Sequence, residues 1–375
     1  KGQSDYAIAN ETLNKLAQHL QTRYPKMSAV AINWGPWEGG MVTPALEAIF
    51  ETEGIKTIPM AAGAELAICE LECGCPAPEI VVLGHGSQIE LAPEPKKEFV
   101  VSMEGQPYLF DHMLAGKGVV PAATLQEWMV QQVGERVDLS NGFSCKDFKV
   151  LKGVRFDGDA SLTISVALSP GIGENSYQAI VVDAAGTKYA KAVIGASDSN
   201  HTLGDNWTRH SIAREIQLPS ISQLYQEDLF HGTVFQCLND VVALDRGGIM
   251  GGFSTSVSTK SVLRNPFGRP HLSHTLMVDA GLQLAIIWTS RVLGQPCLPS
   301  SWDEYIQFGA IPAELVGQIT LQIRDYKHRM LEADLLFADS DGQPLALMRN
   351  YKAVMDPTLK QAFQRVRTPA NVEAL

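Results

Sequence analysis

The sequence predicts an α+β fold of two similar units, each an antiparallel sheet around one long helix, with a smaller α/β segment before them. Two observations predict the pair of units. A strand, a long apolar helix and a series of strands follow residue 98, and the same order recurs after residue 219. Helices that alternate with strands in residues 1–92 predict the α/β segment. No sequence-level repeat is visible, so the duplication rests on the order of the elements.

The α/β segment is expected to cover residues 1–92. Apolar spacing and short buried runs predict helices and strands in turn, at residues 6–20, 28–33, 61–71 and 79–83. Residues 93–98 combine prolines with alternating charge and lack apolar periodicity, which is typical of a linker between domains.

The first unit is predicted at residues 99–200. A strand-like stretch from Phe99 to Phe110 leads into a loop that contains glycine. Pro121 suits the first turn of a helix from Ala122 to Val133. Alternating, β-branched segments then predict four strands, at residues 143–151, 160–168, 177–183 and 188–196. Residues 201–218 form the expected second linker.

The second unit is predicted at residues 219–357. Its long helix should run from Leu276 to Val292, where apolar side chains dominate. Strands are expected before and after that helix, at residues 241–244, 252–258, 305–311, 317–325, 330–338 and 344–354. Residues 358–375 should be a polar tail.

Bulk properties exclude several classes of protein. A net charge of -11 without clustered Lys and Arg argues against nucleic acid as a main partner. The longest apolar run is interrupted by Asp279 and Gln283, and the first residues lack a signal-peptide pattern, so we expect no membrane span and a cytoplasmic location. The six cysteines should be reduced thiols, and the spacing of Cys69, Cys73 and Cys75 lacks the paired pattern of a zinc site. We therefore expect no metal.

One candidate for chemistry is His112, in the pattern His-x3-Gly-x4-Pro that ends at Pro121. An imidazole with an ordinary pKa of ~6.5 at the mouth of a cleft would suit a general base. Gly116 and Gly118 would let a substrate approach the backbone, and the helix that begins at Pro121 offers N–H groups to a polarised carbonyl. The alternative is a surface histidine in an ordinary flexible loop.

A second candidate is Asp279, which lies in a strongly apolar helical stretch where a carboxylate is costly to bury. Burial should raise its pKa and keep a proton available near neutral pH. Gln283 lies one turn later on the same face, placed to bond the substrate or the neighbouring site. The alternative is a carboxylate at the helix N-cap or first turn. The glycine turn from His231 and Gly232 to Phe235 is expected to line the same cleft.

Taken together, these patterns resemble the dehydratase domains of polyketide synthases and related fatty-acid synthases. Four motifs carry the resemblance: Tyr108-Leu-Phe-Asp-His112, His112-x3-Gly116-x4-Pro121, Leu224-Tyr225 ahead of His231-Gly232-x2-Phe235-Gln236, and Asp279-x3-Gln283. It covers about residues 97–356. The resemblance implies a double hotdog fold, with His112 as base and Asp279 as acid. It also implies an acyl chain on the phosphopantetheine of an acyl carrier protein, no cofactor for dehydration, other domains of the same synthase as partners, and a homodimer.

Two departures from that family concern the pocket. Its frequent Tyr-Gly-Pro-x-Phe appears here as the segment from His231 to Phe235, and its Pro-Gly-Ala appears as Pro121-Ala122-Ala123. Acyl chain length and double-bond geometry therefore stay open.

The α/β segment resembles the last part of a ketoreductase domain from the same synthases. Tyr6-x3-Asn10 is similar to the catalytic segment of that family, and residues 33–41 are similar to its substrate-side loop. The glycine motif and serine of that family would lie upstream of Lys1. The NADPH site is therefore expected to be incomplete, with Tyr6 and Asn10 as relics. A ketoreductase followed directly by a dehydratase resembles the end of polyunsaturated-fatty-acid synthases and of glycolipid-type iterative synthases more than a usual module, in which the dehydratase precedes the ketoreductase.

The sequence thus predicts removal of water from a 3-hydroxyacyl carrier-protein thioester, giving a 2-enoyl thioester. Other interpretations stay open. One is an inactive dehydratase-like module that docks the carrier protein and helps to dimerise the synthase. Others are a double-bond isomerase or cyclase in the same pocket, and a hotdog thioesterase that releases free acid.

Overall fold

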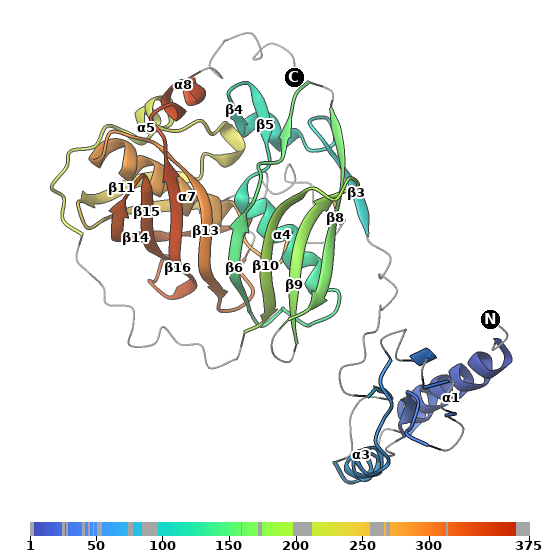
Figure 1. Cartoon of the computed structure of the whole chain (residues 1–375). Helices are drawn as coiled ribbons and strands as arrows, with labels where there is room; N and C mark the ends of the chain where they lie inside the picture. The colour runs from blue at the N-terminus through green and yellow to red at the C-terminus, as the bar shows by residue number, and fades with distance from the viewer. Residues whose placement is uncertain are drawn as a thin grey trace. The chain divides into compact units, whose positions relative to one another are not determined.

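The computed structural model divides the chain into two compact units, Lys1–Pro95 and Lys96–Leu375 (Figure 1). The structure describes residues 4–24, 27, 29–39, 42–43, 46–47, 49–50, 55–73, 78–84, 97–158, 160–171, 175–197, 212–255, 266–267, 271–312 and 314–364. Most of the predicted linker at 93–98, residues 201–211 of the second linker, and residues 365–375 of the predicted tail lie outside these ranges.

The first unit alternates helices and strands, as its sequence predicts. Its elements are α1 (Ser4–Arg23), β1 (Ala31–Trp34), α3 (Met60–Cys73) and β2 (Glu79–Val82). The two strands pair in parallel, from Ala31 opposite Glu79 to Trp34 opposite Val82. Parallel neighbours need a crossover connection, which α3 supplies here. The derivation of this unit from a ketoreductase stays a prediction.

An 11-stranded antiparallel sheet forms the framework of the second unit. In spatial order it comprises β11 (Leu238–Asp245), β12 (Gly248–Thr255), β14 (Leu315–Lys327), β15 (Met330–Asp339), β16 (Pro344–Met355), β13 (Cys297–Gln307), β6 (Phe143–Val150), β10 (Lys188–Ala196), β9 (Ser176–Asp183), β8 (Ser161–Pro170) and β3 (Glu98–Ser102). A small second sheet contains β4 (Met113–Leu114), β5 (Lys117–Val119) and β7 (Arg155–Phe156).

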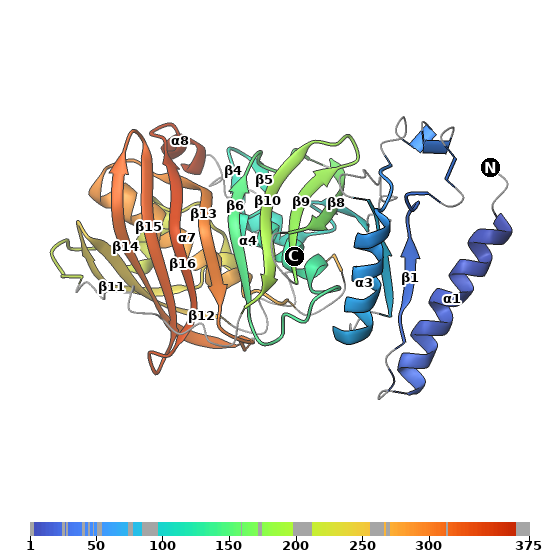
Figure 2. The ribbon, with the colours of Figure 1, turned by 60° about the horizontal axis from the view of Figure 1, so that its bottom comes forward.

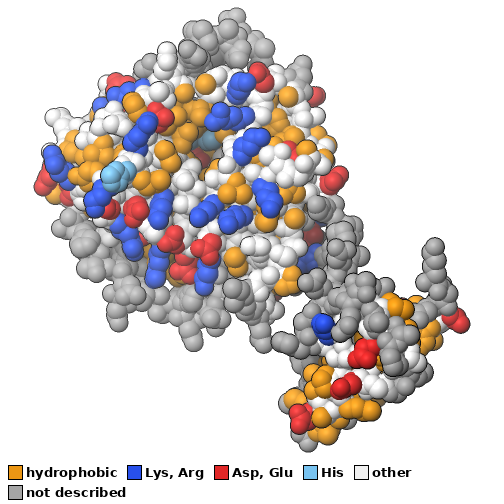
Figure 3. Space-filling view, in the orientation of Figure 1, with side chains coloured by type: hydrophobic (Ala, Val, Ile, Leu, Met, Phe, Trp, Pro, Cys, Tyr) orange, Lys and Arg blue, Asp and Glu red, His pale blue; other side chains and the backbone are white. Residues whose placement is uncertain are grey.

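Two buried helices lie against this sheet, one in each half. Every residue of α4 (Ala122–Val133) is buried, and α7 (Thr275–Val292) is buried from Thr275 to Thr289. Helix α4 packs against β9 and β10, and α7 packs mainly against β12 and β13 (Figures 1 and 2). Long apolar side chains therefore face inward, while charged side chains of both signs are interspersed over the outer face of the sheet (Figure 3). The large antiparallel sheet and its two long helices agree with the prediction, whereas the two separate sheets expected from the sequence form one continuous sheet.

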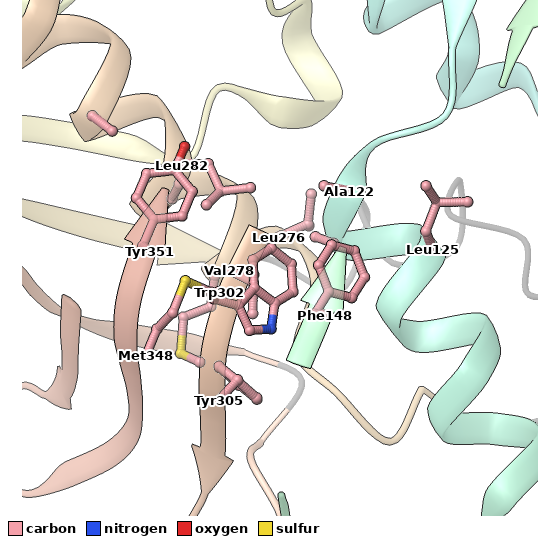
Figure 4. Packing of buried hydrophobic residues seen from close by; sticks show 14 of the residues in the cluster. Ala122, Leu125, Phe148, Leu276, Val278, Leu282, Trp302, Tyr305, Met348 and Tyr351 are labelled. Atoms are coloured by element: carbon pink, nitrogen blue, oxygen red, sulfur yellow. The ribbon is translucent and has the colours of Figure 1, made fainter. Parts of the chain in front are cut away.

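The two halves share one seam, the pairing of β6 with β13. This pairing runs from Ser301 opposite Lys149 to Gln307 opposite Phe143. On the inner face, Phe148 of β6 and Trp302 of β13 stack with ring centroids 3.7 Å apart, and both side chains are buried (Figure 4). Such an aromatic pair contributes about 0.5–1.5 kcal/mol beyond the area that it buries. The halves are therefore joined by a continuous sheet and a shared core.

Short elements differ from the prediction where local chemistry interrupts a strand. The predicted strand from Phe99 to Phe110 ends at Ser102, and a 3-10 helix, η1, follows at Pro107–Asp111. The Gln106 side chain accepts a hydrogen bond from the Ser102 N–H at 2.8 Å, which closes a turn, and Pro107 has no N–H for a ladder. The predicted strand at residues 305–311 begins earlier, at Cys297.

The predicted tail is also partly structured. Helix α8 (Leu359–Gln364) carries Phe363, whose side chain is buried against Phe230 with ring centroids 4.8 Å apart. The prediction of a polar tail is wrong for these residues, because a single aromatic anchor is enough to hold a short helix on the core. Two further short elements, α5 (Ile221–Glu227) and η2 (Thr233–Phe235), flank the His231 turn.

Candidate active site

A cavity of about 170 Å³ receives side chains from both halves of the second unit. Its walls are mostly apolar, and its polar side chains are two histidines, one aspartate and one arginine. The lining residues are His112, Leu114, Val119, Val120, Ala122, Leu125, Val150, Gly153, Arg155, Phe230, His231, Asp279, Leu282, Ile286, Leu298 and Pro299. Ala122, Leu125 and Leu282 come from the two central helices, as Figure 4 shows.

His112 is placed by a tight hairpin that folds its own loop back on itself. The Val119 N–H donates to the His112 carbonyl at 2.9 Å, and Ala115 and Gly116 make the turn with φ of 50° and 79°. The His112 Nδ1 lies 2.6 Å from the Val119 carbonyl oxygen. A carbonyl can only accept, so Nδ1 carries the proton and Nε2 keeps its lone pair.

The environment of His112 differs from the predicted mouth of a cleft. Its side chain is 7% exposed and lies between the rings of Phe230 and Phe235 at centroid distances of 4.9 and 5.2 Å. Burial lowers the pKa of His112 to about 4, below the ordinary value expected from the sequence. The imidazole is therefore neutral near pH 7, in the form that accepts a proton.

Asp279 lies on α7 beyond its first turn, since the helix begins at Thr275 with His274 as N-cap. The alternative of a capping carboxylate is therefore wrong. Gln283 Nε2 donates to Asp279 Oδ2 at 2.8 Å and to the Phe235 carbonyl at 2.9 Å. Burial raises the pKa of Asp279 to about 7, as its apolar surroundings predict. The carboxyl group thus holds a proton through much of the physiological range.

Gln283 is itself fixed by a chain of hydrogen bonds. The Tyr225 hydroxyl donates to Gln283 Oε1 at 2.9 Å and accepts from the Leu238 N–H at 3.0 Å. Of the two predicted roles for Gln283, contact with the neighbouring site is the one the structure shows. It orients Asp279 and does not line the cavity.

His231 brings a third polar group to the cluster. A β-bridge joins His112 to His231, and their rings lie 5.2 Å apart. His231 Nε2 is 3.6 Å from Asp279 Oδ2, and one donor atom from each of the three residues lies within 4.8 Å of the others. Burial lowers the pKa of His231 well below its usual value, so it is also neutral. His231 thus lines the same cavity as His112 and Asp279.

The predicted glycines, Gly116, Gly118 and Gly232, are not among the residues that line the cavity. A Cβ on Gly118 would overlap the Met103 side chain, and one on Gly232 would overlap Asp111. Gly116 lies on the exposed tip of the turn. These are positions where only backbone fits, so the glycines allow close packing.

Two of the backbone N–H groups that were expected to stabilise an oxyanion are engaged in other hydrogen bonds. The N–H groups of Val119 and Val120 already donate to the carbonyls of His112 and Val154. Pro121 is the N-cap of α4, and its carbonyl accepts from Thr124 and Leu125. The N–H groups of Ala122 and Ala123 therefore have no intrahelical acceptor, and Ala122 lines the cavity.

Several lining residues were not singled out from the sequence. Leu282 and Ile286 follow Asp279 at helical spacing, so the periodicity could have placed them on its face. Leu298, Pro299 and Arg155 belong to strands whose limits or existence were not predicted.

Tyr6 and Asn10 lie on α1 of the first unit, where Tyr6 is exposed and Asn10 Nδ2 donates to the Tyr6 carbonyl at 3.0 Å.

Solved structures share this architecture. The dehydratase domain from the CurJ module of curacin polyketide synthase superposes with a TM-score of 0.56 at 19% identity, covering 73% of this chain and 96% of that one. The dehydratase domain of PpsC from Mycobacterium tuberculosis gives a TM-score of 0.56 at 15% identity over 70% and 95%. The fold is that of a polyketide synthase dehydratase domain. The cavity that contains His112 and Asp279 therefore lies in a fold that this chain shares with hotdog dehydratases.

Sequence comparison points the same way. Residues 209–357 match the family model described as polyketide synthase dehydratase N-terminal domain. One component of the polyunsaturated fatty acid synthase from Thraustochytrium sp. is 28% identical over 338 residues, which cover 86% of this chain. The chain spans 12% of the length of that relative. No helix in the described ranges is long and apolar enough to cross a membrane.

Proposed function

We propose that the second unit removes water from a 3-hydroxyacyl thioester carried by an acyl carrier protein and forms a 2-enoyl thioester. One observation carries the proposal. A neutral histidine with a free Nε2 and a carboxylic acid with a pKa of about 7 meet in one apolar cavity. Neighbouring groups whose environments set opposite proton states are the usual arrangement of a general base and a general acid.

In this mechanism His112 Nε2 takes the proton from C2 of the acyl chain. The C2–H electron pair forms the C2=C3 double bond, and the C3–O bond breaks. Asp279 gives its proton to the departing hydroxyl, which leaves as water. The Ala122 N–H, at the start of α4 beside the cavity, would stabilise negative charge on the thioester oxygen. No redox partner or metal is needed, because one proton and one hydroxyl leave together.

Related structures support these roles. Variants of the CurJ dehydratase with a histidine replaced by phenylalanine, and of the CurK dehydratase with an aspartate replaced by asparagine, are described as inactive mutants. PpsC dehydratase was solved with C12:1-CoA, an acyl thioester.

The proposal extends to a type I polyketide or polyunsaturated fatty acid synthase as the setting, in the cytoplasm. Its other domains and a second copy of the chain would be the partners, and the first unit would be the last part of a ketoreductase domain.

Incubation with a short 3-hydroxyacyl carrier protein tests this function. We expect intact-mass spectrometry to show loss of one water from the carrier species, and NMR of the released acyl group to show a C2=C3 double bond. Release of free acid would indicate a thioesterase instead. An isomerase would leave the mass of the hydroxyacyl substrate unchanged. It would move the double bond of a 2-enoyl substrate. A carrier that binds unchanged would indicate the inactive docking module.

The pH dependence follows from the two pKa shifts. Dehydration requires His112 unprotonated, which holds above about 4, and Asp279 protonated, which holds below about 7. We therefore expect kcat/KM to be highest between these values and to fall as the pH rises through 7. A profile that keeps rising from pH 7 to 9 would contradict Asp279 as the acid. Steady-state rates with a soluble pantetheine thioester measure the profile without the carrier protein.

A further inference from the structure

We propose that His112, His231 and Asp279 together bind one divalent transition metal ion such as Zn²⁺, and that the bound metal blocks the active site. The inhibition rests on the proposed function, whereas the binding does not. Two imidazoles and one carboxylate are a donor set that zinc and neighbouring transition metals take.

The geometry of the cluster is close to that of a metal site. One donor atom from each residue lies within 4.8 Å of the other two, and His231 Nε2 is 3.6 Å from Asp279 Oδ2. Zinc ligands at about 2.0–2.2 Å in a tetrahedral arrangement lie about 3.3–3.6 Å apart. The His231 and Asp279 pair already has this spacing, and a movement of roughly 1 Å by the His112 ring would complete it.

The surrounding hydrogen bonds favour metal binding at two of the three donors. His112 Nδ1 donates to the Val119 carbonyl, which turns the lone pair of Nε2 away from that bond. Asp279 is held by Gln283 at Oδ2. Metal-binding histidines and carboxylates are oriented by such outer contacts, which also raise the basicity of the imidazole.

His231 supplies an independent observation. Its side chain is 3% exposed, and among the described residues Nδ1 has no hydrogen-bond partner. A buried polar atom without a partner destabilises the fold, because its lost contact with water is not replaced. Within the described part of the chain, no group donates to Nδ1 or accepts from it, so the proton can reside there while Nε2 presents its lone pair toward Asp279. The mechanism proposed above leaves this side chain without a proton-transfer step.

Occupancy would remove both catalytic groups at once. The metal would take the His112 lone pair that accepts the C2 proton, and the Asp279 carboxyl that protonates the hydroxyl. The adjoining cavity leaves room for water as a further ligand. The metal-free protein is therefore the active form, and zinc acts as an inhibitor competitive with the acyl chain.

The test uses the full chain with Cys69, Cys73 and Cys75 replaced by serine, so that thiolates in the first unit do not bind the probe. After treatment with a chelator, Zn²⁺ is titrated by calorimetry, and Co²⁺ is added as a spectroscopic probe. We expect one equivalent to bind, with visible Co²⁺ absorption bands of four- or five-coordinate geometry. His231→Phe should weaken binding at least ~10-fold. His19→Phe, at an exposed position on α1, is the matched control and should bind as the parent does.

The outcomes separate this proposal from the proposed function. Equal affinity in the parent, His231→Phe and Asp279→Asn would mean that surface groups alone bind the metal, and would overturn the site. Dehydration that proceeds at full rate in excess Zn²⁺ would overturn the inhibition. If the protein binds Zn²⁺ through His231 but dehydrates no thioester, the metal site is supported and the proposed function is wrong. If His231→Phe does not fold, Asp279→Asn replaces it as the test variant, because asparagine has nearly the same shape as aspartate.

Discussion

Replacing His112 with asparagine is expected to lower kcat/KM for dehydration by about 10²–10⁴, the usual contribution of a general base. An asparagine amide can still donate to the Val119 carbonyl, which now receives the His112 Nδ1–H at 2.6 Å. The hairpin that positions the site should therefore survive, while the lone pair at Nε2 is lost. The rate is measured with a soluble 3-hydroxyacyl thioester.

His328→Asn is the matched control for this variant. His328 is exposed in a turn with φ of 48°, a conformation that asparagine tolerates. Its rate and its unfolding temperature should equal those of the parent protein. If both His112→Asn and the control His328→Asn dehydrated the thioester at the parent rate, the general base would have to be a group other than His112.

Asp279→Asn should lower the same rate by about 10²–10⁴, because an amide has no acidic proton to give to the leaving hydroxyl. The asparagine oxygen can keep the hydrogen bond from Gln283, now 2.8 Å long, so the packing of α7 should not change. A neutral amide also avoids the burial of a charge, which raises the pKa of Asp279 to about 7. Its unfolding temperature at pH 8 should be equal to or above that of the parent.

Asp325→Asn, at a solvent-facing carboxylate bonded to Lys327 on β14, provides the comparison. This variant should leave the rate as it is. Dehydration by Asp279→Asn at the parent rate would exclude the carboxyl group as the acid. A sharp loss of unfolding temperature would show instead that the carboxyl group contributes mainly to the fold.

The long helices were predictable because their signals are local. Pro121 sets the start of α4, and apolar periodicity sets the extent of α7 to within one residue. Asp279 was identifiable because a carboxylate stands out in an apolar helix. The early end of β3 and the helix at residues 359–364 depend on single contacts, Gln106 with Ser102 and Phe363 with Phe230. Such contacts leave no periodic pattern.

The electrostatics of His112 could not be predicted from its own segment. The expected pKa was the ordinary one, whereas Phe230 and Phe235 from the other half exclude water from the ring. The role of Gly232 likewise depends on Asp111, which is distant in the chain. Properties that come from contacts across the halves require the three-dimensional arrangement.

The β6–β13 seam has a consequence for how the protein folds. It pairs segments about 150 residues apart in the chain, such as Lys149 with Ser301. Contacts of such long sequence separation are closed at a high entropic cost and form slowly, whereas each half can gain hairpins of its own first. His112 and Asp279 belong to opposite halves, so we expect catalytic competence to appear in the last kinetic phase of refolding. Before that phase, both halves can hold most of their secondary structure and still lack an active site.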